Sequence, residues 1–295
     1  MNPSTLRVHA ALAFVSILFS LNYILVKIAL REFDPLAFAW LRVVGSAATL
    51  VLIERMVHAG GGARFTSSDR RSMVLYAILG VVANQLLFVS GLNLTTAHEA
   101  AILITTIPIF TLGIALVRRQ ERVSVAKVAG IALAAAGALS IIGVEGALGN
   151  RASLLGDVMI LMNCLSYALY LVLSKPFMLR ASPLRVVTFL FLSGAVMMLP
   201  FSARALARQP WNVSIAAWLA LAGVIAGPTV GAYLLNAWTL VRAESSLVAT
   251  YVYLQPAIAL VLAAIFLGET IHLSALVAGA AIVSGVYLAS RSALR

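Results

Sequence analysis

The sequence predicts an all-α integral membrane protein with ten transmembrane helices, arranged as two inverted five-helix repeats. Three observations lead to this fold class: a very apolar composition, ten long and mostly uncharged stretches, and an internal repeat. Hydrophobic residues make up 62% of the 295 positions and charged residues only 11%, whereas soluble globular proteins are about half apolar and a quarter charged. The chain has too few polar residues to cover a surface that faces water, so we expect lipid to cover the rest.

The expected helices follow from the apolar stretches, because a helix needs roughly 20 apolar residues to cross the hydrocarbon core. Helix is favoured over strand because the stretches do not alternate in polarity, as the strands of a membrane barrel do. The expected helices are Val8–Leu30, Leu36–Ile53, Ser72–Leu92, Ala97–Val117, Val123–Val144, Leu154–Leu173, Val186–Phe201, Ile215–Leu240, Ser246–Leu267 and Leu273–Ala289. The first is interpreted as a retained helix, because it is long and no small-residue cleavage site follows it.

The positive charges support an even number of helices. With ten helices, 15 of the 21 Lys and Arg residues fall on the side that carries both termini and 4 on the other, while Lys27 and Arg42 lie within helices. Cytoplasmic loops of membrane proteins carry an excess of Lys and Arg. The sequence therefore predicts a multi-pass protein of the cell membrane with cytoplasmic termini. The net charge of +11 is explained by this orientation, so nucleic acid is not expected as a partner.

The chain also repeats itself at a spacing of about 148 residues. Pro108 matches Pro256 and Glu121 matches Glu269 at this spacing. The repeat predicts two halves, 1–147 and 148–295, with five helices each. Because five is odd, the second half would enter the membrane upside down relative to the first. Inverted halves are typical of secondary transporters, with the binding site near the midplane between them.

These features resemble the EamA family of the drug/metabolite transporter superfamily, over nearly the whole chain. The likeness is carried by the alanine-rich starts of the fourth and ninth helices, Pro108, Pro256, Glu121, Glu269, the glycine-rich segments from Gly130 and Gly279, Gly156–Asp157 and Arg42. The resemblance implies two fused five-helix repeats with cytoplasmic termini. It also implies transport of a small organic metabolite, such as an amino acid, a nucleoside or a drug, in many members by export.

Polar side chains near the middle of the expected helices are the candidates for a substrate-binding site. Such side chains are costly in lipid and usually face the interior of the bundle or a cavity. The candidates are Asn84, Gln85, Asn163, Tyr167, Tyr251, Gln255 and Arg42. Neutral amides and phenols suit a polar or zwitterionic solute, and the tyrosines suit an apolar or aromatic part of it. The alternative is that these groups only form hydrogen bonds between helices, worth about 0.6–2 kcal/mol each.

Three charged residues within or beside the expected helices need partners. Arg42 lies close to the middle of its helix, so we expect a protein partner, water or a substrate anion beside it. Lys27 lies nearer the end of the first helix, from which its ammonium group can reach the interface. Glu99, in the first turn of the fourth helix, is the acid best placed to pair with Lys27 or Arg42 or to carry a proton.

Helix-breaking and small residues mark further positions. Pro108 and Pro256 fall near the middle of their helices, and Gly227 and Pro228 near the middle of the eighth. A proline inside a helix removes one hydrogen bond and kinks it, so these positions are either hinges or fixed kinks. In the fifth and tenth helices, small residues at four-residue spacing favour close packing of helices over a dimerisation seam.

Motifs of other function classes are missing from the sequence. It has no GxxxxGK[ST] phosphate loop, no GxSxG or HExxH motif, and no His/Cys cluster with metal-ligand spacing. We therefore expect no enzyme activity, cofactor or metal. The expected partners are a small-molecule substrate and the lipid bilayer, with the chain as a monomer or homodimer. A secondary carrier that works by alternating access is favoured, and a channel, a lipid flippase or scramblase, and an intramembrane enzyme are the alternatives.

Overall fold

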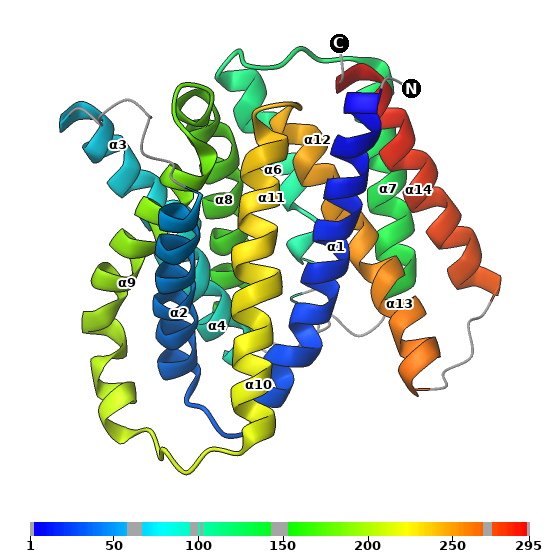
Figure 1. Ribbon diagram of the computed structural model, residues 1–295. Coiled ribbons are helices and arrows are strands. Elements are labelled where there is room, and N and C mark those ends of the chain that lie inside the picture. The colour runs from blue at the N-terminus through cyan, green and yellow to red at the C-terminus, as the bar shows by residue number, and fades with distance from the viewer. Residues whose placement is uncertain are drawn as a thin grey trace.

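The protein is a bundle of helices (Figure 1). The computed structural model describes residues 3–57, 67–94, 100, 103–142, 153–267 and 273–293, and it contains no strand within these ranges. The first helix, α1 (Pro3–Ala29), begins at the same end of the bundle at which the last helix, α14 (Leu273–Ala293), finishes. We call this the termini end of the bundle and the other the opposite end.

Six helical stretches in the described ranges are long and apolar enough to cross a membrane. They are Thr5–Val26, Pro35–Met56, Asp69–Leu92, Leu154–Met178, Pro183–Arg208 and Ile215–Leu240. Shorter apolar helices cover Ile107–Val117, Val125–Ser140 and Leu276–Ser290. Large apolar side chains such as Val196, Ile215 and Leu219 are mostly exposed on the outside, which suits contact with lipid. The chain is therefore an all-α, multi-pass membrane protein, and the total of ten spans stays a prediction.

The long helices lie on the predicted stretches, although several begin or end some residues beyond the predicted positions. Helix α2 covers Pro35–Met56, α3 covers Ser67–Ala77, α4 covers Asn84–Leu94, α10 covers Ile215–Val224 and α11 covers Ala232–Leu240. Helices α8 (Ser153–Met178) and α9 (Pro183–Arg208) are longer than predicted. Helix α9 starts earlier because Pro183 occupies its first turn, where the missing N–H costs nothing. It ends later because the helix continues past the apolar stretch, through polar and charged residues, to Arg208.

Two of the long spans contain a π-helical segment in the middle. Segment η1 (Ile78–Ala83) joins α3 to α4, and η2 (Ile225–Gly231) joins α10 to α11. The final residues of the two segments are 148 positions apart, which is the spacing of the sequence repeat. Gly227 and Pro228 lie in η2, so the predicted break is a local widening of a continuous helix. Such segments leave carbonyl groups free for other partners.

The two repeat-related prolines lie directly after interruptions of a helix. Helix α6 (Ile107–Val117) begins one residue before Pro108 and follows a turn at Thr105–Thr106. In the second half, α12 (Ser245–Thr250) leads through the 3-10 turn η3 (Tyr251–Tyr253) into α13 (Leu254–Leu267), which has Pro256 in its first turn. Each proline thus starts a helical segment instead of kinking a continuous helix.

Neighbouring helices form side-chain hydrogen bonds to carbonyl groups at these interruptions, in addition to the local backbone bonds from Thr106 and Leu254. The Leu103 carbonyl accepts hydrogen bonds from the Cys164 thiol of α8 (3.5 Å) and the Thr106 hydroxyl (2.6 Å). The Tyr251 carbonyl accepts one from the Ser16 hydroxyl of α1 (2.8 Å). Leu103 and Tyr251 are 148 positions apart, and so are Ser16 and Cys164. The same local arrangement therefore occurs once in each half of the chain.

The first helix of each half packs against helices of the other half. Helix α1 lies against α10, α11 and α13, whereas α8 lies against α4 and α6 (Figure 1). Helices α7 (Val125–Ile142) and α14 pack side by side. A Cβ added at Gly285 would lie 2.5 Å from the Ala134 backbone nitrogen, so this small residue allows the close approach. The prediction that these small residues serve helix packing is confirmed within the chain.

Candidate functional site

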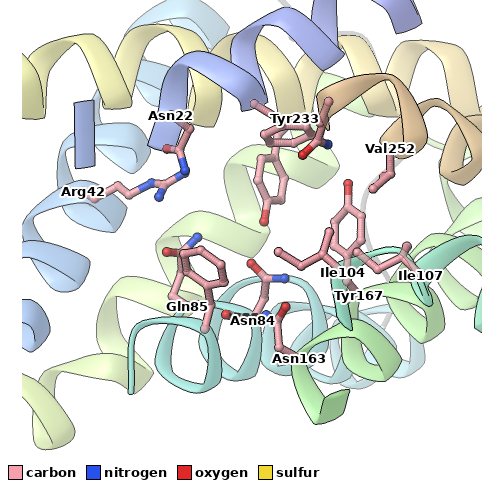
Figure 2. A pocket seen from close by; sticks show the side chains of 13 residues that line it. Asn22, Arg42, Asn84, Gln85, Ile104, Ile107, Asn163, Tyr167, Tyr233 and Val252 are labelled. Atoms are coloured by element: carbon pink, nitrogen blue, oxygen red, sulfur yellow. Dashed lines mark hydrogen bonds between the residues drawn. The ribbon is translucent and has the colours of Figure 1, made fainter. Parts of the chain in front are cut away.

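A partly open cavity of about 100 Å³, lined by polar and apolar side chains, lies within the bundle. A water molecule needs only about 10–15 Å³ of such space, so the cavity has room for several waters or a small organic molecule. Its lining comes from both halves of the chain: Phe19, Asn22, Arg42, Asn84, Gln85, Phe88, Ile104, Ile107, Asn163, Tyr167, Tyr233, Val252 and Gln255. Figure 2 shows Arg42 and Asn22 at one end of the cavity and Tyr167 and Val252 at the other.

Six of the seven predicted binding residues line this cavity together. They are Arg42, Asn84, Gln85, Asn163, Tyr167 and Gln255. All but Asn84 are less than 10% exposed. They come from four different helices, α2, α4, α8 and α13, and the packing of these helices brings them around one cavity. Their placement around a single cavity agrees with the expected site, while their contact with a substrate stays a prediction.

Arg42 is the cation of the cavity among the described residues. It is only 5% exposed, and its Nε donates a 2.7 Å hydrogen bond to the hydroxyl of Thr229 in η2. That hydroxyl in turn donates to the Val224 carbonyl at 2.7 Å, a group near the start of the π-helical segment. In the described part of the chain, no carboxylate lies within 4.0 Å of the guanidinium group. The local helix geometry therefore fixes the position of a charge that no described acid neutralises.

Hydrogen bonds to backbone groups and to other side chains hold the neutral polar residues in place. Asn163 Nδ2 donates to the Asn84 carbonyl at 2.7 Å, and the Tyr233 hydroxyl donates to the Gly80 carbonyl of η1 at 2.7 Å. The hydroxyl of Tyr167 accepts a 3.1 Å hydrogen bond from Asn236 Nδ2. These contacts are hydrogen bonds between helices, which the sequence analysis gave as the alternative to substrate binding. Structural bonding and a cavity-facing position thus occur together at the same residues.

The sequence analysis missed two polar residues of the cavity. Asn22 lies in α1 and is 8% exposed, and its Oδ1 has no hydrogen-bond partner. Tyr233 lies in α11 and is 4% exposed. Its ring stacks edge-on against Phe191, with 4.9 Å between ring centres. A repeat comparison contains a signal for Tyr233, because it stands 148 positions after Gln85.

Tyr251 lies on a second, smaller cavity instead of the main one. This cavity has a volume of about 10 Å³ and shares Tyr167, Val252 and Gln255 with the main cavity. The Tyr251 hydroxyl forms a short hydrogen bond with the imidazole of His9. Since His9 belongs to α1 and Tyr251 to η3, this bond joins the first helix to the interrupted helix of the second half.

The remaining candidates are the predicted hinge residues and the predicted pair of Glu99 with Lys27 or Arg42. Pro108 and Pro228 are buried, and Pro108, Pro256, Gly227 and Pro228 occupy the interruptions and the π-helical segment described above. No observation tests whether they act as hinges. Glu99 and the side chain of Lys27 lie outside the described part of the structure, so their pairing stays a prediction.

A buried charge network closes the termini end of the bundle. Lys127 Nζ lies 3.1 Å from Glu121 Oε2 and 2.5 Å from Glu244 Oε2. The Glu121 carboxylate also accepts hydrogen bonds from the backbone N–H (3.0 Å) and the hydroxyl of Ser246 at the start of α12. Lys127 and Glu121 are almost fully buried. The network joins the α6–α7 connection of the first half to the start of α12 in the second.

A smaller set of hydrogen bonds joins two connections at the opposite end. The Glu32 carboxylate, between α1 and α2, accepts hydrogen bonds from the Ser214 backbone N–H (2.7 Å) and hydroxyl (2.5 Å). These bonds lower the pKa of Glu32 below its ordinary value. Gln209 bonds to the Asp34 N–H and the Glu32 carbonyl, at 2.6 and 3.0 Å. Groups from the two halves therefore meet at both ends of the bundle.

Taken together, the apolar helices and the cavity with its buried polar side chains define a multi-pass membrane protein with an internal polar site. The model of the EamA-like transporter family matches the chain twice, over residues 7–143 and 154–291. The chain therefore belongs to the EamA-like transporter family, and its role is that of a membrane transporter.

Individual relatives and solved structures agree with this family. An uncharacterized transporter of Archaeoglobus fulgidus is 28% identical over 292 residues, which is 98% of each chain. A probable terminal-alkyne amino-acid exporter of Streptantibioticus cattleyicolor is 28% identical over 254 residues, 84% of this chain and 83% of the relative. One solved crystal structure superposes with a TM-score of 0.80 over 97% of both chains at 21% identity, which shows the same fold.

Proposed function

We propose that this protein is a secondary transporter of a small organic metabolite that works by alternating access. The solute is amino-acid-like, nucleoside-like or drug-like, and the protein acts as an exporter or exchanger. In this proposal the chain crosses the cell membrane ten times, with cytoplasmic termini, and two inverted five-helix halves enclose the site. The Streptantibioticus relative, named as a probable amino-acid exporter, supports the amino-acid-like class.

The observation that carries the proposal is the cavity lining. Ile104 and Val252, Ile107 and Gln255, and Gln85 and Tyr233 are three pairs of lining residues, and the members of each pair stand 148 positions apart. Equivalent positions of the two halves therefore face one space. In inverted-repeat carriers the site lies between the halves, and rocking of one half against the other exposes it to alternate sides.

Contacts at the two ends of the bundle support movement of this kind. The buried Lys127–Glu121–Glu244 network holds the halves together at the termini end, and hydrogen bonds from Ser214 and Gln209 do so at the opposite end. In the proposed cycle each set of contacts opens while the other remains closed. A continuously open channel would need neither set to break.

The test combines ligand binding with counterflow. The purified protein is screened for thermal stabilisation by amino acids, nucleosides and vitamins, because a ligand of the folded state raises the apparent melting temperature. The labelled form of each stabilising compound is then offered to proteoliposomes preloaded with the unlabelled compound. Saturable uptake that transiently exceeds equilibrium identifies a carrier. Flux without saturation or counterflow would favour a channel, and movement of labelled lipid alone would favour a flippase or scramblase.

A further inference from the structure

One end of the cavity carries a charge that the other described lining residues do not balance. Arg42 is 95% buried and faces the cavity, and its described side-chain hydrogen bond uses Nε alone. The other polar lining residues are neutral amides and phenols. An unpaired buried cation is strongly unfavourable. The guanidinium therefore needs an anion or water inside the cavity, in addition to the neutral hydroxyl of Thr229.

The guanidinium group of Arg42 is well suited to bind a carboxylate. The planar guanidinium group presents several N–H donors in a fixed fork, which fits the two oxygens of a carboxylate. Thr229 binds Nε and is itself anchored to the Val224 carbonyl. This arrangement fixes the plane of the group before any ligand arrives, so less conformational entropy is lost on binding.

The positive charge belongs to one half of the chain only. The residue 148 positions after Arg42 is Leu190, which is fully buried in the apolar core. Asn22 lies beside Arg42 (Figure 2) and has a buried oxygen without a partner. Apolar residues, among them Phe19, Phe88 and Ile104, complete the wall. A bound solute would therefore be oriented, with its anionic group toward Arg42 and its apolar body along these side chains.

We propose that the transported solute is an organic carboxylate whose carboxylate group binds the Arg42 guanidinium. Arg42 is then the residue that selects acids over their neutral amides and esters. The unpartnered Asn22 oxygen accepts a hydrogen bond from an N–H group of the same solute, where the solute has one. This inference rests on the transport function proposed above and names the chemical class of its substrate.

The experiment uses matched ligands that differ in charge at one position. The probes are L-leucine, 4-methylpentanoate (the same acid without its ammonium group), L-leucinamide, and the corresponding acid and amide pairs of the other apolar amino acids. Nucleosides serve as ligands without a carboxylate. Binding is measured by thermal shift and calorimetry on the full-length protein in detergent. We expect the acids to bind and the paired amides to bind about 10- to 100-fold more weakly, the range given by charge-assisted hydrogen bonds.

Three variants assign this selectivity to Arg42. In Arg42→Gln the acid should lose about 10- to 100-fold in affinity, so that acid and amide bind alike. In Arg42→Lys the charge remains without the planar fork, so part of the preference should remain. Tyr167→Phe, at the other end of the cavity, should change acid and amide affinity equally. If the Gln variant does not fold, the Lys variant still tests whether acid selectivity depends on the guanidinium group of Arg42.

Several outcomes overturn the inference. It fails if no carboxylate-bearing probe binds, if amides or nucleosides bind as well as the acids, or if acid selectivity survives in Arg42→Gln. It also fails if Arg42→Gln lowers only the stability of the ligand-free protein, as expected for a permanent pair with an acid such as Glu99. Counterflow of a nucleoside with no binding of acids would refute the inference and leave the transport function intact. Arg42-dependent binding of acids without any flux would support the carboxylate site and refute the transport function.

Discussion

At the scale of single residues, the charge of Lys127 is enclosed almost completely. Its ammonium group lies between Glu121 and Glu244, and its side chain is only 2% exposed. Lys127→Met would leave the buried Glu121 carboxylate without its cation, and removing one partner of a buried pair costs about 3–5 kcal/mol. We expect a much lower unfolding midpoint in detergent.

The partly exposed pair of Arg185 and Glu54 provides the control for this prediction. Its side chains are 22% and 25% exposed, with 3.3 Å between the charged atoms. Arg185→Met should therefore lower stability by only about 0.2–1 kcal/mol. Equal losses of stability in the two variants would contradict a structural role of the Lys127 network.

Glu99 gives a second prediction at this scale. The sequence makes it the acid best placed to pair with Lys27 or Arg42 or to carry a proton. If it carries the coupling proton, Glu99→Gln should abolish the pH dependence of counterflow in proteoliposomes and slow transport driven by a pH gradient. An unchanged rate and an unchanged pH profile would exclude both roles.

The residues of the cavity were predictable to the extent that they break an apolar pattern. Asn84, Gln85 and Asn163 stand out because amides in an apolar helix are costly. Tyr233 does not, since its ring satisfies the same pattern as a core phenylalanine and only its hydroxyl bonds to Gly80. Tyr251 lies on the smaller neighbouring cavity, in the turn η3, whose side-chain directions differ from those of the regular helix that the sequence predicts.

At the scale of elements, the contact between α7 and α14 depends on glycine. A side chain at Gly285 would meet backbone atoms of α7, the Ala134 nitrogen at 2.5 Å and the Gly130 oxygen at 2.6 Å. Backbone atoms cannot move aside as the tip of a side chain can. Gly285→Val should therefore force the helices apart and destabilise the protein by about 1–3 kcal/mol, measured as the unfolding midpoint in detergent.

Gly279 in the same helix is the matched control. A Cβ at this position meets nothing within 4 Å. Because alanine is a better helix former than glycine, Gly279→Ala should leave stability unchanged or raise it by up to about 1 kcal/mol. A Gly285→Val variant as stable as Gly279→Ala would show that the two helices do not need this close approach.

Element boundaries were predictable where composition decides them, and irregular geometry was not. The span Ile215–Leu240 has the predicted bounds, because its apolar stretch ends in polar connections at both sides. The π-helical segment within it follows from packing: Thr229 reaches both the Val224 carbonyl and Arg42. Likewise, Pro108 and Pro256 indicated irregular helices, but the exact positions of the turns, at Thr105–Thr106 and in η3, could not be predicted from them.

At the scale of the whole molecule, one arrangement recurs in both halves. At each interruption a carbonyl group, that of Leu103 or Tyr251, accepts a local backbone hydrogen bond. The same carbonyl also accepts a side-chain hydrogen bond from the first helix of a half, donated by Cys164 or Ser16. In each case the interruption borders the cavity through a neighbouring residue, Ile104 or Val252. We expect these two interruptions to act as hinges in the proposed alternating access, since each half then has a place beside the site where its backbone conformation can change.

The orientation of the chain provides the most global prediction. Because α1 begins and α14 ends at the same end of the bundle (Figure 1), residues 7 and 295 should face one side of the membrane. The positive-charge bias makes that side the cytoplasm. The background for labelling is Cys164→Ala, which removes the chain's single cysteine, a buried one. Single cysteines are then placed as Arg7→Cys, Arg295→Cys and, in the α9–α10 connection, Asn212→Cys.

A membrane-impermeant maleimide added to intact cells should label Asn212→Cys and leave the other two variants unlabelled until the cells are opened. Asn212 is exposed and lies in the connection at the opposite end of the bundle (Figure 1), so accessibility does not limit its reaction. Labelling of positions 7 and 295 from different faces would require an odd number of spans. Two five-helix halves could not then account for the chain, and the cavity would lose its symmetric position between them.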